Sequence, residues 1–128
     1  MPKQIFCRLP GSITGELTSS ADFAFSEEAK LLLQAYIPGI LWTNRKPPKP
    51  TDFKIKHFES EKFAFSQRKK IITLHDSWKG MLTLDIFHLL YSVARVEFLK
   101  KHLFPVHAAC VRYAQKNILL VGHSGVGK

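Results

Sequence analysis

The sequence has few cysteines and lacks any long apolar run. Its 128 residues include only Cys7 and Cys110, which lie in strand-like apolar contexts without metal-ligand spacing. We therefore expect two reduced, buried thiols rather than a disulfide or a metal site. No apolar stretch approaches the roughly 20 residues that span a bilayer, and the N-terminus lacks the pattern of a signal peptide. These absences favour a cytoplasmic protein that has no membrane partner.

Acidic residues are scarce relative to basic ones. Lysine and arginine together number 19, against 10 for aspartate and glutamate, which gives a formal net charge of +9. A charge of this size suits an anionic partner such as a nucleotide, a nucleic acid, an acidic protein or a membrane surface. Hydrophobic residues make up 45% of the chain, and the length fits one ordinary domain, so we expect a folded globular protein.

The N-terminal part is predicted to contain one strand and one helix. Residues 3–9 are typical of a short strand, whereas residues 11–20 are rich in turn-forming types. A helix is predicted over residues 26–37, because Ser26 can cap its first turn and Pro38 ends it.

A proline-rich segment follows this helix. Residues 44–50, NRKPPKP, contain three prolines that fix the backbone and three cations that favour water. We expect an exposed extended crossing or a linker. A domain boundary is not indicated, because 43 residues before it would form a small core. Whether residues 1–43 pack on the rest is left open.

The middle of the chain has the period of strands. Phe53, Ile55 and His57 alternate with lysines and Phe58, and two more strand-like segments follow, so residues 52–75 predict an antiparallel meander. Their cations and aromatic rings would also suit a nucleic-acid surface. We favour strands with apolar side chains inward and lysines outward, and we expect no nucleic-acid partner.

A triplet of triad-like residue types follows the last of these strands. His75, Asp76 and Ser77 have the side chains of a serine hydrolase, but adjacent residues cannot adopt that geometry. We therefore predict a turn.

The period then changes to that of a helix. Thr83 can cap it, Asp85 lies in its first turn, and Pro105 ends the run after several basic residues. The apolar residues predicted to share one buried face are Ile86, Leu89, Leu90, Val93 and Val96.

Two apolar runs near the C-terminus predict a strand pair. Residues 106–113 and 118–121 are joined by a polar turn, and the second run leads directly into GHSGVGK. Glycines allow backbone amides to surround phosphate oxygens, and a lysine reaches the outer phosphates. Because a buried strand is the context that this motif requires, we predict a phosphate-binding loop. Its contact residues are Gly122, Ser124, Gly125, Val126, Gly127 and Lys128.

Such a loop needs a helix that begins at or after its lysine, and magnesium needs a Ser or Thr and acidic residues beyond it. The sequence ends at Lys128. We therefore expect residues 1–128 to be a single incomplete domain, the N-terminal part of a longer protein, with little nucleotide binding of its own.

The segment FPVHAACVRYAQKNILLVGHSGVGK resembles the kinase domain of HPr kinase/phosphorylase and of the related HPr-kinase-like serine kinases. Members have a histidine that opens a strand, a turn, a second apolar strand and a Gly-x-Ser-Gly-x-Gly-Lys loop. His107 lies 21 positions before Lys128, which matches the family spacing. Ala108 and His123 stand where the family usually has glycine and an acidic residue, so the sequence is closer to the divergent relatives.

The resemblance implies an α/β P-loop kinase fold of the HPr kinase/phosphoenolpyruvate carboxykinase type. It implies ATP and magnesium as cofactors and a protein or peptide substrate with a target serine, and it leaves a homo-oligomer open. By position, His107 corresponds to the active-site histidine beside the transferred phosphate, with a histidine at a strand edge as the plainer alternative. His123 is expected to face solvent or to line the nucleotide mouth.

Other functions remain open at this point. Transporter ATPases have a similar loop, phosphoenolpyruvate carboxykinase is similar in both loop and fold, and a basic non-enzymatic binding module would make the loop incidental.

Overall fold

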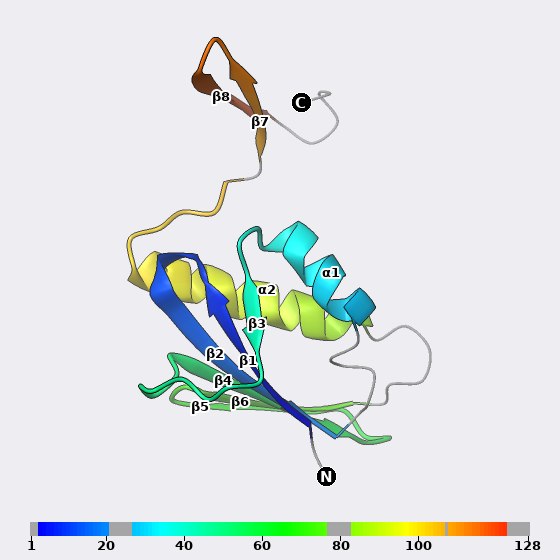
Figure 1. Ribbon diagram of the computed structural model, residues 1–128. Helices are drawn as coiled ribbons and strands as arrows, with labels where there is room; N and C mark the ends of the chain where they lie inside the picture. The colour runs from blue at the N-terminus through cyan, green and yellow to red at the C-terminus, as the bar shows by residue number, and fades with distance from the viewer. Residues whose placement is uncertain (1–2, 21–26, 77–82, 107, 123–128) are drawn as a thin grey trace.

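The computed structural model describes residues 3–20, 27–76, 83–106 and 108–122, which form a mixed α/β structure (Figure 1). Six strands form one sheet, two helices pack on it, and two further strands form a separate hairpin. The elements in chain order are β1 (Lys3–Leu9), a 3-10 turn (Pro10–Ser12), β2 (Ile13–Ser19), α1 (Glu27–Tyr36), β3 (Leu41–Thr43), β4 (Phe53–Glu59), β5 (Ala64–Arg68), β6 (Ile71–Asp76), α2 (Thr83–Lys100), β7 (Ala108–Tyr113) and β8 (Lys116–Val121).

The predicted N-terminal strand is confirmed, but the turn-rich interpretation of residues 11–20 was wrong. These residues contribute a tight turn and then β2, which pairs antiparallel with β1. Gly11 in the turn has a φ of 77°, a conformation that glycine adopts without strain. Beyond the turn, inward residues alternate with half-exposed ones, the period of a strand with one buried face. This alternation indicated a strand, whereas the residue types suggested a turn.

The predicted antiparallel meander over residues 52–75 was also wrong, although its three strands are present. The order of the sheet is β3-β1-β2-β4-β6-β5, with β6 inserted between β4 and β5. β4 runs parallel to both β2 and β6, and only β5 and β6 form a hairpin. β6 contributes the buried residues Ile72 and Leu74, whereas every residue of β5 is exposed. The more apolar strand therefore takes the central place.

The proline-rich segment connects two parts of one sheet. The residues before it supply β1, β2 and β3, and the residues after it supply β4, β5 and β6. Its prolines line a cavity of about 300 Å³ together with Phe6, Glu16 and Lys54. Phe6 is only 3% exposed although it points away from the helices. Residues 44–50 thus form a crossing over the sheet, and residues 1–43 pack with the rest.

Both helices lie on the same side of the six-stranded sheet (Figure 1). The core between them and the sheet contains Leu33, Ile37, Leu90 and Ala94 together with inward residues of the strands. The helix predicted over residues 26–37 is confirmed as α1, and Ser26 lies outside the described residues.

The long helix is confirmed as α2, but its predicted buried face was partly wrong. Leu90 is buried and Leu89 and Val93 are partly buried, whereas Val96 is 52% exposed and the side chain of Ile86 is not described. α2 ends with hydrogen bonds from the amides of Lys101 and Leu103 to the carbonyl of Phe98. None of the helices in the described part of the chain combines the length and the hydropathy of a membrane-spanning segment.

Candidate functional site

A hairpin leads into the glycine-rich loop. β7 and β8 pair antiparallel, with Ala108 opposite Val121 at the open end and Tyr113 opposite Lys116 at the turn. Ala114 and Gln115 in the turn have φ values of 45° and 61°. Positive φ at both central positions matches the twist of a two-residue hairpin. The predicted strand pair is therefore confirmed.

Gly122 is the one predicted site residue that the structure describes. It directly follows β8 and is exposed. His107, Ser124, Gly125, Val126, Gly127 and Lys128 lie outside the described residues, as does His123.

The register of the hairpin still relates the two ends of the predicted site. Ala108 follows His107 in the chain and pairs with Val121, which precedes Gly122.

The hairpin exposes apolar side chains. Ile118, Leu119, Leu120 and Val121 are between 43% and 67% exposed, although their composition predicts a buried strand. Figure 1 shows the hairpin standing apart from the helices and the larger sheet. The strand was predicted correctly but its burial was not, because no described element covers either face.

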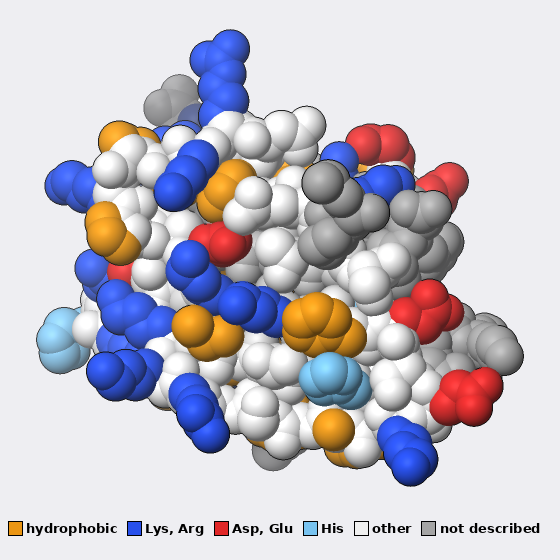
Figure 2. All heavy atoms as spheres, turned by 90° about the horizontal axis from the view of Figure 1, so that it is seen from below, with side chains coloured by type: hydrophobic (Ala, Val, Ile, Leu, Met, Phe, Trp, Pro, Cys, Tyr) orange, Lys and Arg blue, Asp and Glu red, His pale blue; other side chains and the backbone are white. Residues whose placement is uncertain are grey.

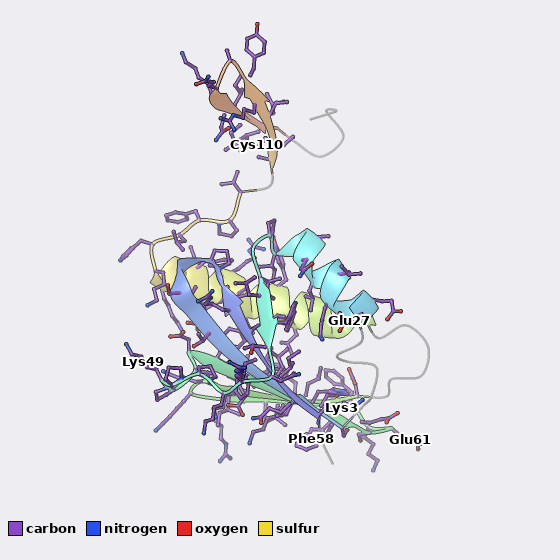
Figure 3. All side chains as sticks on the ribbon, in the orientation of Figure 1. Lys3, Glu27, Lys49, Phe58, Glu61 and Cys110 are labelled. Carbon is purple, nitrogen blue, oxygen red and sulfur yellow. The ribbon has the colours of Figure 1, made fainter. Side chains whose placement is uncertain are left out.

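The two cysteines differ in environment, which corrects one prediction. Cys7 is 1% exposed, and burial raises the pKa of its thiol to about 12. Cys110 is exposed on the hairpin, as Figure 3 shows. The predicted burial of Cys7 is therefore confirmed, and the predicted burial of Cys110 is wrong.

A second group of polar side chains is buried against the six-stranded sheet. Ser19 on β2, His57 on β4 and Asp76 on β6 are 0%, 1% and 7% exposed. Ser19 Oγ lies 2.8 Å from His57 Nδ1, and His57 Nε2 lies 2.7 Å from Asp76 Oδ1. The turn predicted at residues 75–77 was wrong, because His75 and Asp76 end β6; Ser77 lies outside the described residues.

The environment of His57 determines its protonation. Burial lowers the pKa of the imidazole below its ordinary value of 6.5, while the hydrogen bond and charge of Asp76 oppose this shift. A neutral imidazole carries one N–H group. Because a carboxylate accepts only, Nε2–H donates to Asp76, and the Ser19 hydroxyl donates to Nδ1.

These three residue types also form catalytic triads, but this group lacks an essential property of one. A nucleophilic serine must reach a substrate carbonyl, and Ser19 is completely buried. The arrangement instead satisfies buried polar atoms and links three neighbouring strands. The alternation in β4 predicted His57 to point inward, but nothing local in the sequence indicated Ser19 or Asp76 as its partners.

The described residues offer no metal centre, since no group of three or more His, Cys, Asp and Glu side chains among them could hold an ion. An apolar cavity of about 310 Å³ lies between the ends of α1 and α2, where Ile37, Tyr91 and Phe98 are among its lining residues. None of its described lining residues is basic, so these residues offer no counter-charge to a phosphate group.

Comparisons with known proteins identify no family for this chain. No family model, no curated protein and no solved structure matches it.

Proposed function

We propose that this chain carries the ATP-binding loop of a serine kinase similar to HPr kinase, which transfers phosphate from ATP to a serine of a protein or peptide. The proposal includes the P-loop kinase fold of the HPr kinase/phosphoenolpyruvate carboxykinase type. One observation carries it: β8 ends at Val121, directly before the loop, and Val121 pairs with the residue that follows His107. A strand that leads into the glycines is the context in which this motif binds phosphate.

Each residue has a role in the proposal. Backbone amides from Gly122, Ser124, Gly125, Val126 and Gly127 surround the phosphate oxygens, and the Lys128 ammonium neutralises the outer phosphates. His107 lies beside the transferred phosphate. Magnesium accompanies ATP in the proposal.

The chemistry depends on position and charge. The serine oxygen forms a bond to the γ-phosphorus while the bond from that phosphorus to the β–γ bridging oxygen breaks, and the serine proton passes to a base. Charge develops on the phosphoryl and bridging oxygens, so fixed amides and a lysine beside them lower the barrier.

The test is a phosphotransfer assay with the full-length gene product, γ-labelled MgATP and a cell extract, with labelled phosphoserine as the readout. Replacing Lys128 by Ala should lower the rate at least about 10²-fold, whereas Lys116→Ala, which removes an exposed lysine of β8, should not. Equal activity of the Lys128→Ala protein would remove the loop assignment.

Other outcomes would favour the alternative functions. ATP hydrolysis without phosphoserine would favour a transporter-type ATPase. Phosphorylation coupled to decarboxylation of oxaloacetate would favour a carboxykinase-like enzyme. An absence of nucleotide binding would favour a basic binding module.

A further inference from the structure

The larger sheet ends at an exposed strand. β5 (Ala64–Arg68) pairs with β6 on one side, and no described strand pairs with its other side. All five of its residues are exposed. An edge strand of this kind presents backbone N–H and C=O groups that another chain can pair with. β5 is therefore a site at which a sheet can be extended.

A groove runs beside this edge, between β5 and α2. It encloses about 220 Å³, and the apolar side chains in its lining include Phe65, Ile72, Val93 and Val96. Phe65 and Val96 are both 52% exposed. Val96, which the helical pattern predicts to be buried, is thus an exposed residue in the lining of this groove. A further strand beside β5 would cover these side chains.

The charges around the groove select the kind of strand that fits. Lys100 at its rim is neutralised by Glu97, since their Nζ and Oε1 atoms are 2.6 Å apart. Lys69 and Lys70 also line the groove, and neither forms an ion pair within the described part of the chain. Two unneutralised cations beside an apolar groove favour a ligand that combines carboxylates with apolar side chains.

The same cations disfavour a second copy of the chain. If two β5 strands paired antiparallel, Lys62 before each strand would face the basic end of the other, at Arg68, Lys69 and Lys70. Like charges directly opposite destabilise strand pairs. On the face of the molecule seen from below, Figure 2 shows lysine and arginine side chains gathered over one part and aspartate and glutamate side chains over others.

We propose that an extended, acidic segment of a partner protein adds to β5 as a strand. Its backbone pairs with the free edge, its apolar side chains fill the groove over Phe65 and Val96, and its carboxylates bind Lys69 and Lys70. This is the mode of recognition by strand addition, in which main-chain bonds give affinity and side-chain pockets give specificity. The proposal does not depend on the phosphate-binding loop.

The test measures binding of a fluorescein-labelled ten-residue peptide of alternating Glu and Val to the full-length gene product by fluorescence anisotropy. The control peptide has Lys in place of Glu. We expect the acidic peptide to bind and the basic peptide to bind at least tenfold more weakly. Val96→Glu and the double variant Lys69→Glu/Lys70→Glu should each weaken acidic-peptide binding at least about tenfold.

Two control variants test whether a change of charge or of surface polarity elsewhere on the protein is enough to weaken peptide binding. Lys46→Glu/Lys49→Glu changes the same charge on the proline-rich crossing, and Leu41→Glu changes an exposed apolar residue on β3 at the other edge. Neither should alter peptide binding, and hydrogen exchange at β5 amides should slow when the peptide is bound.

Several results would overturn the proposal. These are an acidic peptide that does not bind, equal losses in the groove and control variants, and tighter binding of a single-stranded oligonucleotide at the same residues. Dimerisation through β5, detected by sedimentation and abolished by Val96→Glu, would assign the edge to a second copy instead.

Discussion

His57 Nε2 lies 2.7 Å from Asp76 Oδ1 in the interior of the six-stranded sheet. Ser19 completes the group on the other ring nitrogen, so β2, β4 and β6 share one buried hydrogen-bond network. Burial is the larger influence on His57 and lowers its pKa.

The first prediction concerns stability and pH. A histidine whose pKa is lower in the folded state binds its proton more readily when the protein unfolds, so stability is highest above pH 6.5 and falls as the pH decreases below it. One such group contributes at most about 1.4 kcal/mol per pH unit. Urea unfolding between pH 7.5 and pH 5 should show this loss, and His57→Gln should reduce the slope.

His102→Asn provides the control for this prediction, because His102 is exposed and its φ of 57° suits asparagine. This variant should keep the pH dependence of the parent. A slope that His57→Gln leaves unchanged would mean that other groups determine it.

The second prediction concerns Gly15 on β2. A Cβ atom at this position would lie 2.2 Å from the Phe53 ring and 2.9 Å from Cys7 Sγ, so Gly15→Ala forces the core apart. We expect the free energy of unfolding to fall by roughly 1–3 kcal/mol. The cost of Gly15→Ala should be smaller in a Phe53→Leu background, measured as a double-mutant cycle. Equal costs in the two backgrounds would contradict the contact.

The third prediction concerns the two thiols. Cys110 is exposed, whereas Cys7 is buried with a raised pKa. The thiolate is the reactive form. A thiol reagent at pH 8 should therefore modify Cys110 quickly and Cys7 only after denaturation. Cys110→Ser should remove the fast phase and Cys7→Ser should retain it. Two fast-reacting thiols in the parent would contradict the burial of Cys7.

Local signals predicted elements better than they predicted pairing. The alternation in β4 and the apolar spacing in α2 identified both elements, because each depends on neighbours in sequence. The position of β6 between β4 and β5 depends on which of the strands β5 and β6 would lose more free energy if its apolar side chains were exposed at the edge of the sheet. That comparison involves separate segments of the chain, so no local pattern reveals it. The exposure of Val96 has a similar cause, since it follows from what other elements cover. Strand β2 was missed for a different reason, because its turn-forming residue types were given more weight than the alternation of its residues.

In the candidate sites, too, contiguous features could be predicted from the sequence and features that join separate segments could not. The strand that leads to Gly122 could be predicted because motif and strand are contiguous. The partners of His57 could not, because Ser19 and Asp76 lie on separate strands and have ordinary local contexts. The groove beside β5 likewise exists only through the arrangement of the sheet and α2.

The glycine-rich loop is proposed to bind ATP phosphates, and equilibrium binding of MgATP measures this interaction. MgATP should be titrated calorimetrically into the full-length gene product, its Lys128→Ala variant and its Lys116→Ala variant. We expect saturable binding that Lys128→Ala weakens at least about tenfold, from the loss of a charge-assisted contact of about 1.5–3 kcal/mol. Lys116→Ala should leave this binding unchanged. Binding of equal strength in all three proteins, or binding in none, would contradict it.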